Sequence, residues 1–295
     1  MPIQYDIVHT TNYRYRKPVR FGEHRVMFRP RDSHDLRVLA TDLEVTPDAD
    51  VRMIQDPHSN SIALVQPLEA ASALTIVCSF TIEHAQSLNL ELPLDPAAEV
   101  FPFPYSVDER FDLEHYLRPA HDDPGGILTA WTRQFIRTDG PTGTRQMLVE
   151  MNQHIREHFR YEAREEEGTQ EPNVTLEKGA GSCRDFALLM MEAGRRLGIA
   201  TRFVSGYLYD PSLDSGDADG AMQGAGYTHA WLQAYLPGAG WVPFDPTNNL
   251  LGGTQLIRVG VARHPSQAAP ISGSWYGDSG DYLGMEVNVQ VSRRR

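Results

Sequence analysis

Three side chains in the second half of the chain, a cysteine, a histidine and an aspartate, have the types and local settings that thiol chemistry requires. Cys183 begins a helical run and follows Gly181-Ser182. His229 lies in an apolar, strand-like segment downstream, and Asp245 ends the next such segment. A cysteine that attacks an amide carbonyl needs a base that takes its proton and a carboxylate that orients the base. Cys183, His229 and Asp245 are therefore the candidate parts of a thiol acyl-transfer site.

A reactive thiol at Cys183 depends on the histidine. An unperturbed cysteine has a pKa of about 8.5, so only about 3% of it is thiolate at pH 7. Lowering that pKa to about 5 takes roughly 5 kcal/mol, of which a helix N-terminus supplies about 1–2 kcal/mol. Imidazolium is the usual cation that supplies the rest. The local sequence alone also fits an inert buried cysteine, and it is His229 together with Asp245 that favours the reactive thiol.

The predicted elements place these side chains in suitable positions. Ser182 is a good N-cap, so Cys183 lies in the first turn of a helix over 183–197, where free backbone N–H groups can hold an oxyanion. Gly198 ends this helix. Strands are expected over 201–209, 228–236 and 240–244, with a tight turn at 237–240 between the last two. Earlier apolar residues at helical spacing predict helices over 128–135 and 147–159.

The first hundred residues have the alternating pattern of strands instead. Alternation over 5–15, 51–55, 61–65 and 74–83 predicts an antiparallel β-sandwich, with Cys78 as a small core residue. A proline-rich stretch over 92–104 predicts an extended linker. We therefore predict a β-rich N-terminal domain over 1–100 and a catalytic domain over 101–295, with its core over 125–255. A last strand is expected over 285–291.

The amino-acid composition and net charge of the chain restrict the classes of partner that it can bind. The 295 residues include 27 Lys and Arg against 39 Asp and Glu, a formal net charge of −12. This charge argues against nonspecific binding to nucleic acid or to an anionic membrane, and we find no run of about 18 apolar residues that would span a bilayer. The sequence shows no secretion signal, and its two cysteines predict reduced thiols in a cytoplasmic protein. A basic excess within residues 1–37 fits a solvated face or a docking patch for a partner protein.

The sequence contains no motif that we recognise as typical of cofactor or metal binding. His154 and His158 lie four residues apart on a helix but lack the His-Glu-x-x-His arrangement of zinc proteases. Asp214, Asp217 and Asp219 have the wrong spacing for a calcium loop. We predict a surface loop over 211–226 that could cover the cleft, no cofactor and no metal.

The motifs around the three candidate residues resemble the bacterial transglutaminase-like superfamily, a family of cysteine-protease-like proteins. The resemblance implies a papain-like core with Cys183 as nucleophile, His229 as general base and acid, and Asp245 as orienter. The first hundred residues resemble the N-terminal region that often precedes this core. The segments that carry the resemblance are Gly181-Ser182-Cys183-Arg184-Asp185, Leu197-Gly198-Ile199-Ala200-Thr201-Arg202-Phe203-Val204-Ser205-Gly206-Tyr207, His229-Ala230-Trp231, and Gly240-Trp241-Val242-Pro243-Phe244-Asp245-Pro246-Thr247-Asn248.

The predicted fold class is α+β, a papain-like or transglutaminase-like catalytic core preceded by an antiparallel β-sandwich-like domain. The predicted function is acyl transfer on peptide or protein amides through a thioester, with water as the favoured acceptor because an amine acceptor needs its own binding site. Two alternatives remain open. One is transglutaminase-type transfer to an amine, and the other is a noncatalytic peptide-binding or assembly module.

Overall fold

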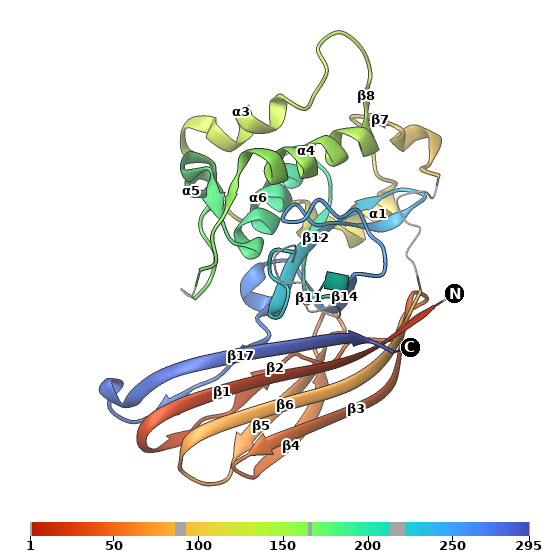
Figure 1. Ribbon diagram of the computed structural model, residues 1–295. Coiled ribbons are helices and arrows are strands. Elements are labelled where there is room, and N and C mark those ends of the chain that lie inside the picture. Colours follow the sequence, from red (N-terminus) through yellow and green to blue (C-terminus); the bar gives the residue numbers. More distant parts are fainter. Residues whose placement is uncertain (1, 86–92, 165–166, 213–221, 295) are drawn as a thin grey trace.

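The computed structural model describes residues 2–85, 93–164, 167–212 and 222–294. Two antiparallel sheets form a sandwich in the lower half of Figure 1. The first sheet has the order β16–β1–β6–β3, with β17 also paired to β1, and the second has the order β15–β2–β5–β4. The strands of the first sheet are β1 (Ile3–Phe21), β3 (Leu36–Thr46), β6 (Ala71–His84), β16 (Trp275–Tyr276) and β17 (Tyr282–Arg293). Those of the second are β2 (His24–Val26), β4 (Ala49–Gln55), β5 (Ser61–Pro67) and β15 (Ile271–Ser272).

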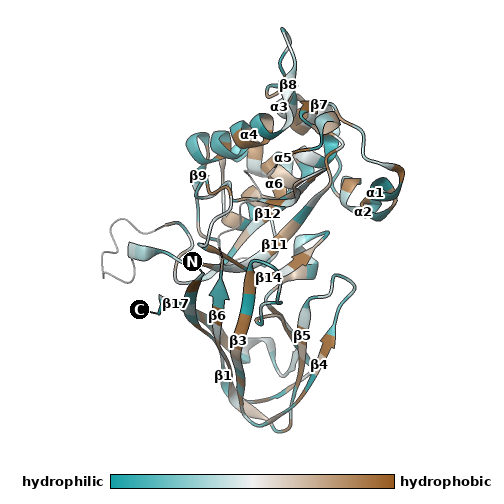
Figure 2. Ribbon diagram, turned by 90° about the vertical axis from the view of Figure 1, so that its right-hand side faces the viewer, coloured by the Kyte–Doolittle hydropathy of each residue, from teal (hydrophilic) through white to brown (hydrophobic). Residues whose placement is uncertain are grey.

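A second layered unit lies above the sandwich and holds the candidate site. Its antiparallel sheet has the order β13–β12–β11–β14, made by β13 (Gly240–Phe244), β12 (Thr228–Leu236), β11 (Thr201–Leu208) and β14 (Leu256–Ala262). Helices cover the side of this sheet turned away from the sandwich, as the two perpendicular views agree (Figures 1 and 2). They are α3 (Ile127–Arg133), α4 (Thr144–His158), α5 (Pro172–Lys178) and α6 (Cys183–Arg196). The short helices α1 (Val107–Asp112) and α2 (Glu114–Leu117) pack elsewhere, with Tyr116 of α2 in contact with His58 of the sandwich and with Trp241 of β13.

Short elements complete the connections. Two-residue strands pair as β7 (Val100–Phe101) with β8 (Thr142–Gly143), antiparallel, and as β9 (Arg160–Tyr161) with β10 (Ala180–Gly181), parallel. Single 3₁₀ turns occur at η1 (Pro96–Ala98), η2 (Pro124–Gly126), η4 (Pro265–Ala268) and η5 (Ser279–Asp281). The β9–β10 pair matters for the site, because it fixes the segment that leads into α6.

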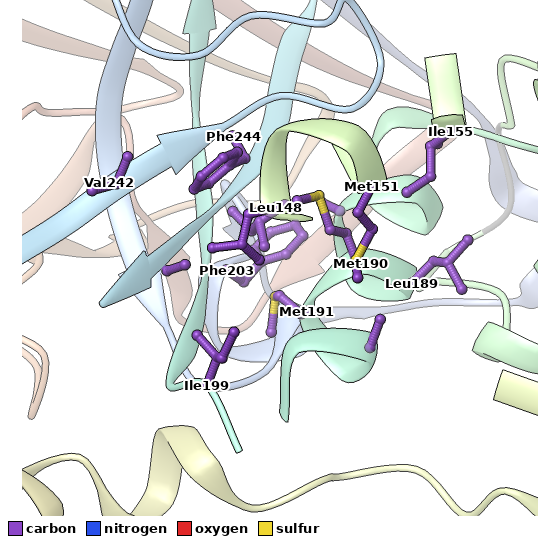
Figure 3. Packing of buried hydrophobic residues seen from close by; sticks show 14 of the residues in the cluster. Leu148, Met151, Ile155, Leu189, Met190, Met191, Ile199, Phe203, Val242 and Phe244 are labelled. Carbon is purple, nitrogen blue, oxygen red and sulfur yellow. The ribbon is translucent and has the colours of Figure 1, made fainter. Parts of the chain in front are cut away.

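The apolar residues that recur at helical spacing in the sequence form the core of the upper unit. Met147, Leu148, Met151 and Ile155 of α4 are buried against α6 and the sheet, and Figure 3 shows this packing between Leu148, Met151, Met190, Phe203 and Phe244. Nearly every residue of α6 is buried. A helix that is apolar around most of its surface must lie inside the fold, which holds its first turn, and Cys183 with it, in one place.

A second core fills the sandwich and extends to the central sheet. It includes Cys78, which is buried on β6 as predicted, together with Tyr207 from β11, Tyr209 directly after this strand, and Ile257 and Val259 from β14. The central sheet is therefore covered on both faces, by α6 on one and by the sandwich on the other.

The last strand is present as predicted, but its partner lies far away in sequence. β17 pairs along most of its length with β1, from Tyr5 opposite Arg293 to Tyr15 opposite Tyr282. Residues of the predicted 101–295 catalytic domain thus complete the N-terminal sheet, and the division at residue 100 stays a prediction. The period-2 pattern of Val287, Val289 and Val291 identifies a strand but does not specify its partner.

The strands and helices predicted around the site agree closely with the observed ones, and the α+β content with an N-terminal β-sandwich is confirmed. Strand β3 is not predicted by the sequence pattern, because most of its side chains are exposed and alternate weakly. Most of the predicted loop over 211–226, including Asp214, Asp217 and Asp219, lies outside the described residues. Within the described ranges, no helix has the length and apolarity needed to cross a membrane.

Candidate active site

Cys183 is the first residue of α6 and follows the N-cap Ser182, which has extended backbone angles (φ −87°, ψ 175°). The Cys183 side chain is 8% exposed, so the sulfur lies at the edge of the core rather than deep within it. The first N–H groups of a helix have no partner inside the helix and carry a partial positive charge. A carbonyl group that approaches Cys183 would meet these N–H groups.

Asp185 anchors the start of α6. Its carboxylate accepts hydrogen bonds from the N–H and the Oγ–H of Ser182 at 2.8 and 2.9 Å, and from the N–H of Gln170 at 2.7 Å. Arg164 donates to both carboxylate oxygens, at 2.8 and 3.0 Å. Burial alone would raise the pKa of Asp185, but these donors outweigh it and lower the pKa below 3.8. Asp185 is therefore a helix-start charge, and its side chain is completely buried.

Replacement of Asp185 with alanine is expected to destabilise the protein by about 3 kcal/mol, because Arg164 loses its buried partner and Ser182 and Gln170 lose their acceptor. Urea unfolding measures this change, and Asp139→Ala, at an exposed carboxylate, is the matched control. A loss below about 0.5 kcal/mol, the range of neutral surface substitutions, would contradict the anchoring role of Asp185.

His229 and Asp245 form a fully buried pair at the ends of β12 and β13. The Nε2–H of His229 donates to Oδ2 of Asp245 at 2.8 Å, and both side chains are 0% exposed. The carboxylate is itself held in place, because Oδ1 accepts from the N–H of Thr247 at 2.9 Å and Oδ2 accepts from Nδ2 of Asn248 at 3.1 Å. Such a carboxylate fixes the tautomer and orientation of the ring.

The other ring nitrogen of His229 remains for the thiol. Nδ1 is buried and has no hydrogen-bond partner of ordinary length among the residues described. Burial by itself would lower the pKa of His229, but the Asp245 carboxylate outweighs it and raises the pKa above 6.5, with a further contribution from Cys183. The structure thus brings together all three residues predicted from the sequence, with Asp245 on one side of the ring and Cys183 close to it.

A short segment over 222–226 closes over the histidine ring. Gly224 has a positive φ of +87°, and a β-carbon on it would lie 2.9 Å from Nδ1 of His229. The N–H of Gln223 donates to Oδ1 of Asn248 at 3.0 Å, and Nδ2 of Asn248 donates back to the carbonyl of Gln223 at 3.2 Å. Asn248 therefore links the covering segment to Asp245, and only glycine fits the backbone against the ring.

Tyr161 is a site neighbour that sequence reasoning missed. It lies on β9 directly opposite Gly181, two residues before the thiol. Burial raises the pKa of Tyr161 to about 12, and the nearby groups Cys183 and Asp245 add to the shift. A neutral phenol therefore borders the site, and nothing in its local sequence distinguishes it from a core tyrosine. Asn248 was missed as well, although it stands in the quoted motif next to Thr247.

The described residues contain no group of three or more His, Cys, Asp or Glu side chains that could hold an ion. His154 and His158, set aside on their sequence pattern, stack on each other with ring centroids 4.1 Å apart on α4.

Two family models match the chain. The model of the transglutaminase-like superfamily matches residues 129–246, which include all three candidate residues, and that of the bacterial transglutaminase-like N-terminal region matches residues 5–83. The uncharacterized protein ML0607 of Mycobacterium leprae is 26% identical over 288 residues, which cover 97% of this chain and 98% of the relative. The uncharacterized protein Rv2569c of Mycobacterium tuberculosis is 26% identical over 307 residues, which cover 98% of this chain and 92% of the relative.

Among solved structures, one named "a Putative Cysteine Protease from Cytophaga hutchinsonii" superposes with a TM-score of 0.71 at 18% identity. The match covers 99% of this chain and 91% of that one. At this identity the likeness concerns the fold. It extends over the sandwich as well as the upper unit, and together with the matched family models it confirms the predicted papain-like, transglutaminase-like fold class.

Proposed function

We propose that this chain, in which a bacterial transglutaminase-like N-terminal region is joined to a core of the transglutaminase-like superfamily, is a thiol-dependent acyl-transfer enzyme. Its substrates are peptide or protein amides. The observation that carries the proposal is the buried His229–Asp245 hydrogen bond of 2.8 Å, with the free ring nitrogen left to a cysteine at a helix N-terminus. A noncatalytic binding module would have no need for a buried, oriented imidazole beside a thiol.

The proposed reaction has two halves. Nδ1 of His229 takes the thiol proton, and the Cys183 sulfur attacks the amide carbonyl carbon to form a C–S bond. The oxyanion is held by the free N–H groups at the start of α6, and the imidazolium then gives its proton to the leaving amine as the C–N bond breaks. In the second half, His229 takes a proton from the acceptor, which attacks the thioester, and the thiol is released.

Water is the acceptor we favour, which makes the protein a peptidase or amidase. A primary amine in its place would make the protein a transglutaminase, with the same three residues in the same roles. The test is mass spectrometry of a peptide library incubated with the full-length protein, with and without an added primary amine. Hydrolysis gives shortened or deamidated peptides in both samples, whereas amine transfer gives adducts only when the amine is present. No change in any peptide, together with no acyl-enzyme on Cys183, would count against the proposed function.

The pH profile tests the role of Asp245. The Asp245 carboxylate raises the pKa of His229 above 6.5. The alkaline limb of the pH profile, where kcat/KM falls as the His229 imidazolium loses its proton, is therefore expected above pH 6.5 in the wild type. Asp245→Asn removes the charge, so the limb is expected to move about 1–3 pH units lower. Asp139→Asn, at an exposed carboxylate, should leave the profile unchanged. An unmoved limb in Asp245→Asn would argue that another group sets it.

We propose the cytoplasm as the compartment of this reaction. Cys78 and Cys183, the two cysteines of the sequence, are both free thiols in the structure, which fits a reducing environment. Fractionation of cells that express the tagged full-length chain tests this assignment, and recovery outside the cytoplasmic fraction would reject it.

A further inference from the structure

A cavity of about 360 Å³ lies between the central sheet and the sandwich, away from the thiol. It is bordered by β11 to β14 on one side and by residues 31, 34–36, 58, 60 and 84 on the other. Trp231 and Gln233 of β12 line it, whereas Ala230 and Leu232 of the same strand belong to the core under α6. The cavity is therefore on the face of β12 turned away from α6, and Cys183 does not line it.

Three guanidinium groups converge on this cavity, from Arg31, Arg202 and Arg258. The single carboxylate in the lining is that of Asp35, which lies 3.5 Å from Arg258. Three histidines, His34, His58 and His84, also line the cavity. Burial lowers the pKa of His58 and of His84 below 6.5, so these two are mainly neutral at pH 7. The arginines thus leave the cavity with a positive charge in a chain whose formal net charge is −12.

Arg202 contacts polar groups without a formal charge, among them the Tyr116 hydroxyl. It is partly buried on β11, its Nε–H donates to Oε1 of Gln233 at 2.9 Å, and its guanidinium lies 4.1 Å from the ring centroid of Trp241. No carboxylate of the described chain lies within ion-pair distance of it. Burial lowers the pKa of Arg202, and repulsion from Arg258 and Arg31 lowers it further. A guanidinium nevertheless stays protonated at neutral pH, so a desolvated cation is held here without a counter-charge.

An anion would complete this arrangement. Guanidinium groups bind phosphate and carboxylate oxygens through paired, charge-assisted hydrogen bonds, which strengthen where water is partly excluded. Leu36, Leu256 and Val259 give the same cavity an apolar wall, and the volume is that of a small-molecule site. This combination suits a small organic molecule with an anionic group better than a lone chloride.

We propose that the cavity binds a small organic anion whose phosphate or carboxylate group is held by Arg202 and Arg258, with Arg31 at the rim. Cys183 and His229 do not line this cavity, although Trp231 in its wall stacks on the His229 ring, and the proposal does not depend on the proposed acyl transfer. Trp231 and Trp241 line the cavity, so their fluorescence reports on its occupancy.

The experiment titrates the full-length protein with sodium phosphate and, separately, with sodium succinate, at ionic strength held constant with sodium chloride. Saturable binding of at least one probe is expected by tryptophan fluorescence and by calorimetry, and the probe that binds tells a phosphate ligand from a carboxylate ligand. Arg202→Gln and Arg258→Gln should each weaken that binding at least about tenfold, which corresponds to about 1.4 kcal/mol. Arg156→Gln, at an exposed arginine of α4, should leave the affinity unchanged.

Two results would overturn the proposal. One is the absence of saturation with both probes, and the other is equal affinity in Arg202→Gln, Arg258→Gln and Arg156→Gln. If Arg202→Gln or Arg258→Gln does not fold, as judged by urea unfolding, Arg31→Gln serves in its place, since the exposed Arg31 guanidinium contacts only the His58 and Ser59 carbonyls among the hydrogen bonds described. Arg31→Gln is expected to weaken binding about threefold or more, and an unchanged affinity would reject the site.

Discussion

Replacement of Cys183 with alanine is expected to lower amide turnover by about 10⁴-fold or more and to remove the covalent acyl-enzyme altogether. The reason is that the proposed mechanism has no second nucleophile, while the helix N-terminus and the substrate contacts that remain give only weak residual catalysis. Turnover is measured on a peptide that the library experiment identifies, and the acyl-enzyme by intact-protein mass spectrometry after rapid acid quench. The variant should fold, because a side chain at the edge of the core is shortened by one atom.

The other cysteine supplies a matched control. Cys78 is buried on β6 in the sandwich, where burial raises the pKa of its thiol to about 11. Cys78→Ala is expected to cost about 1 kcal/mol of stability and to leave turnover and acylation unchanged. Equal losses of turnover in the two variants would mean that the effect is structural. Full turnover in Cys183→Ala would remove the thiol from the mechanism.

Replacement of His229 with glutamine is expected to slow the alkylation of Cys183 by iodoacetamide at pH 6 by about 10- to 1000-fold. A neighbouring opposite charge moves a pKa by about one to three units, and glutamine cannot supply the charge of imidazolium. Because the pKa of His229 is raised above 6.5, the ring is available as a cation at pH 6. Labelling rates from pH 5 to pH 10, read at the Cys183 peptide, measure the effect, which should become smaller at high pH.

His158→Gln is the control for this substitution, because His158 is exposed at the end of α4. It should leave the labelling profile of Cys183 unchanged. The measurement needs no substrate, so it separates the state of the thiol from the question of which amide is cleaved. A labelling profile that is the same in His229→Gln and in the wild type would show that the histidine does not activate the thiol, and it would favour the noncatalytic module.

Much of the site could be predicted from the sequence because its elements have strong local signals. The period-2 pattern of 228–236 and 240–244 gives both strands with the observed bounds, and Ser182 and Gly198 mark the two ends of α6. Once the bounds of these elements are predicted correctly, the antiparallel pairing of the two strands across a tight turn brings His229 and Asp245 to the same edge of the sheet.

What could not be predicted depends on contacts distant in sequence. Asp185 has the local pattern of an exposed helix-start charge, and its burial follows only from Arg164 and Gln170, which fold back over it. The arginine-lined cavity likewise needs three segments far apart in the chain, around Arg31, Arg202 and Arg258. The hydrophobic periodicity of a single segment does not show that side chains from distant segments meet at one cavity.

The pairing of β17 with β1 has a consequence for the order in which the chain folds. The ladder joins residues 5–15 to residues 282–293, so this edge of β1 stays open during synthesis until residues 282–293 have left the ribosome. The contacts of α4, α6 and β11 to β13 are more local, and such contacts form faster than long-range strand pairs. We therefore expect the thiol-bearing unit to assemble first and the first sheet to close last, with the β1 edge exposed to wrong partners in the interval.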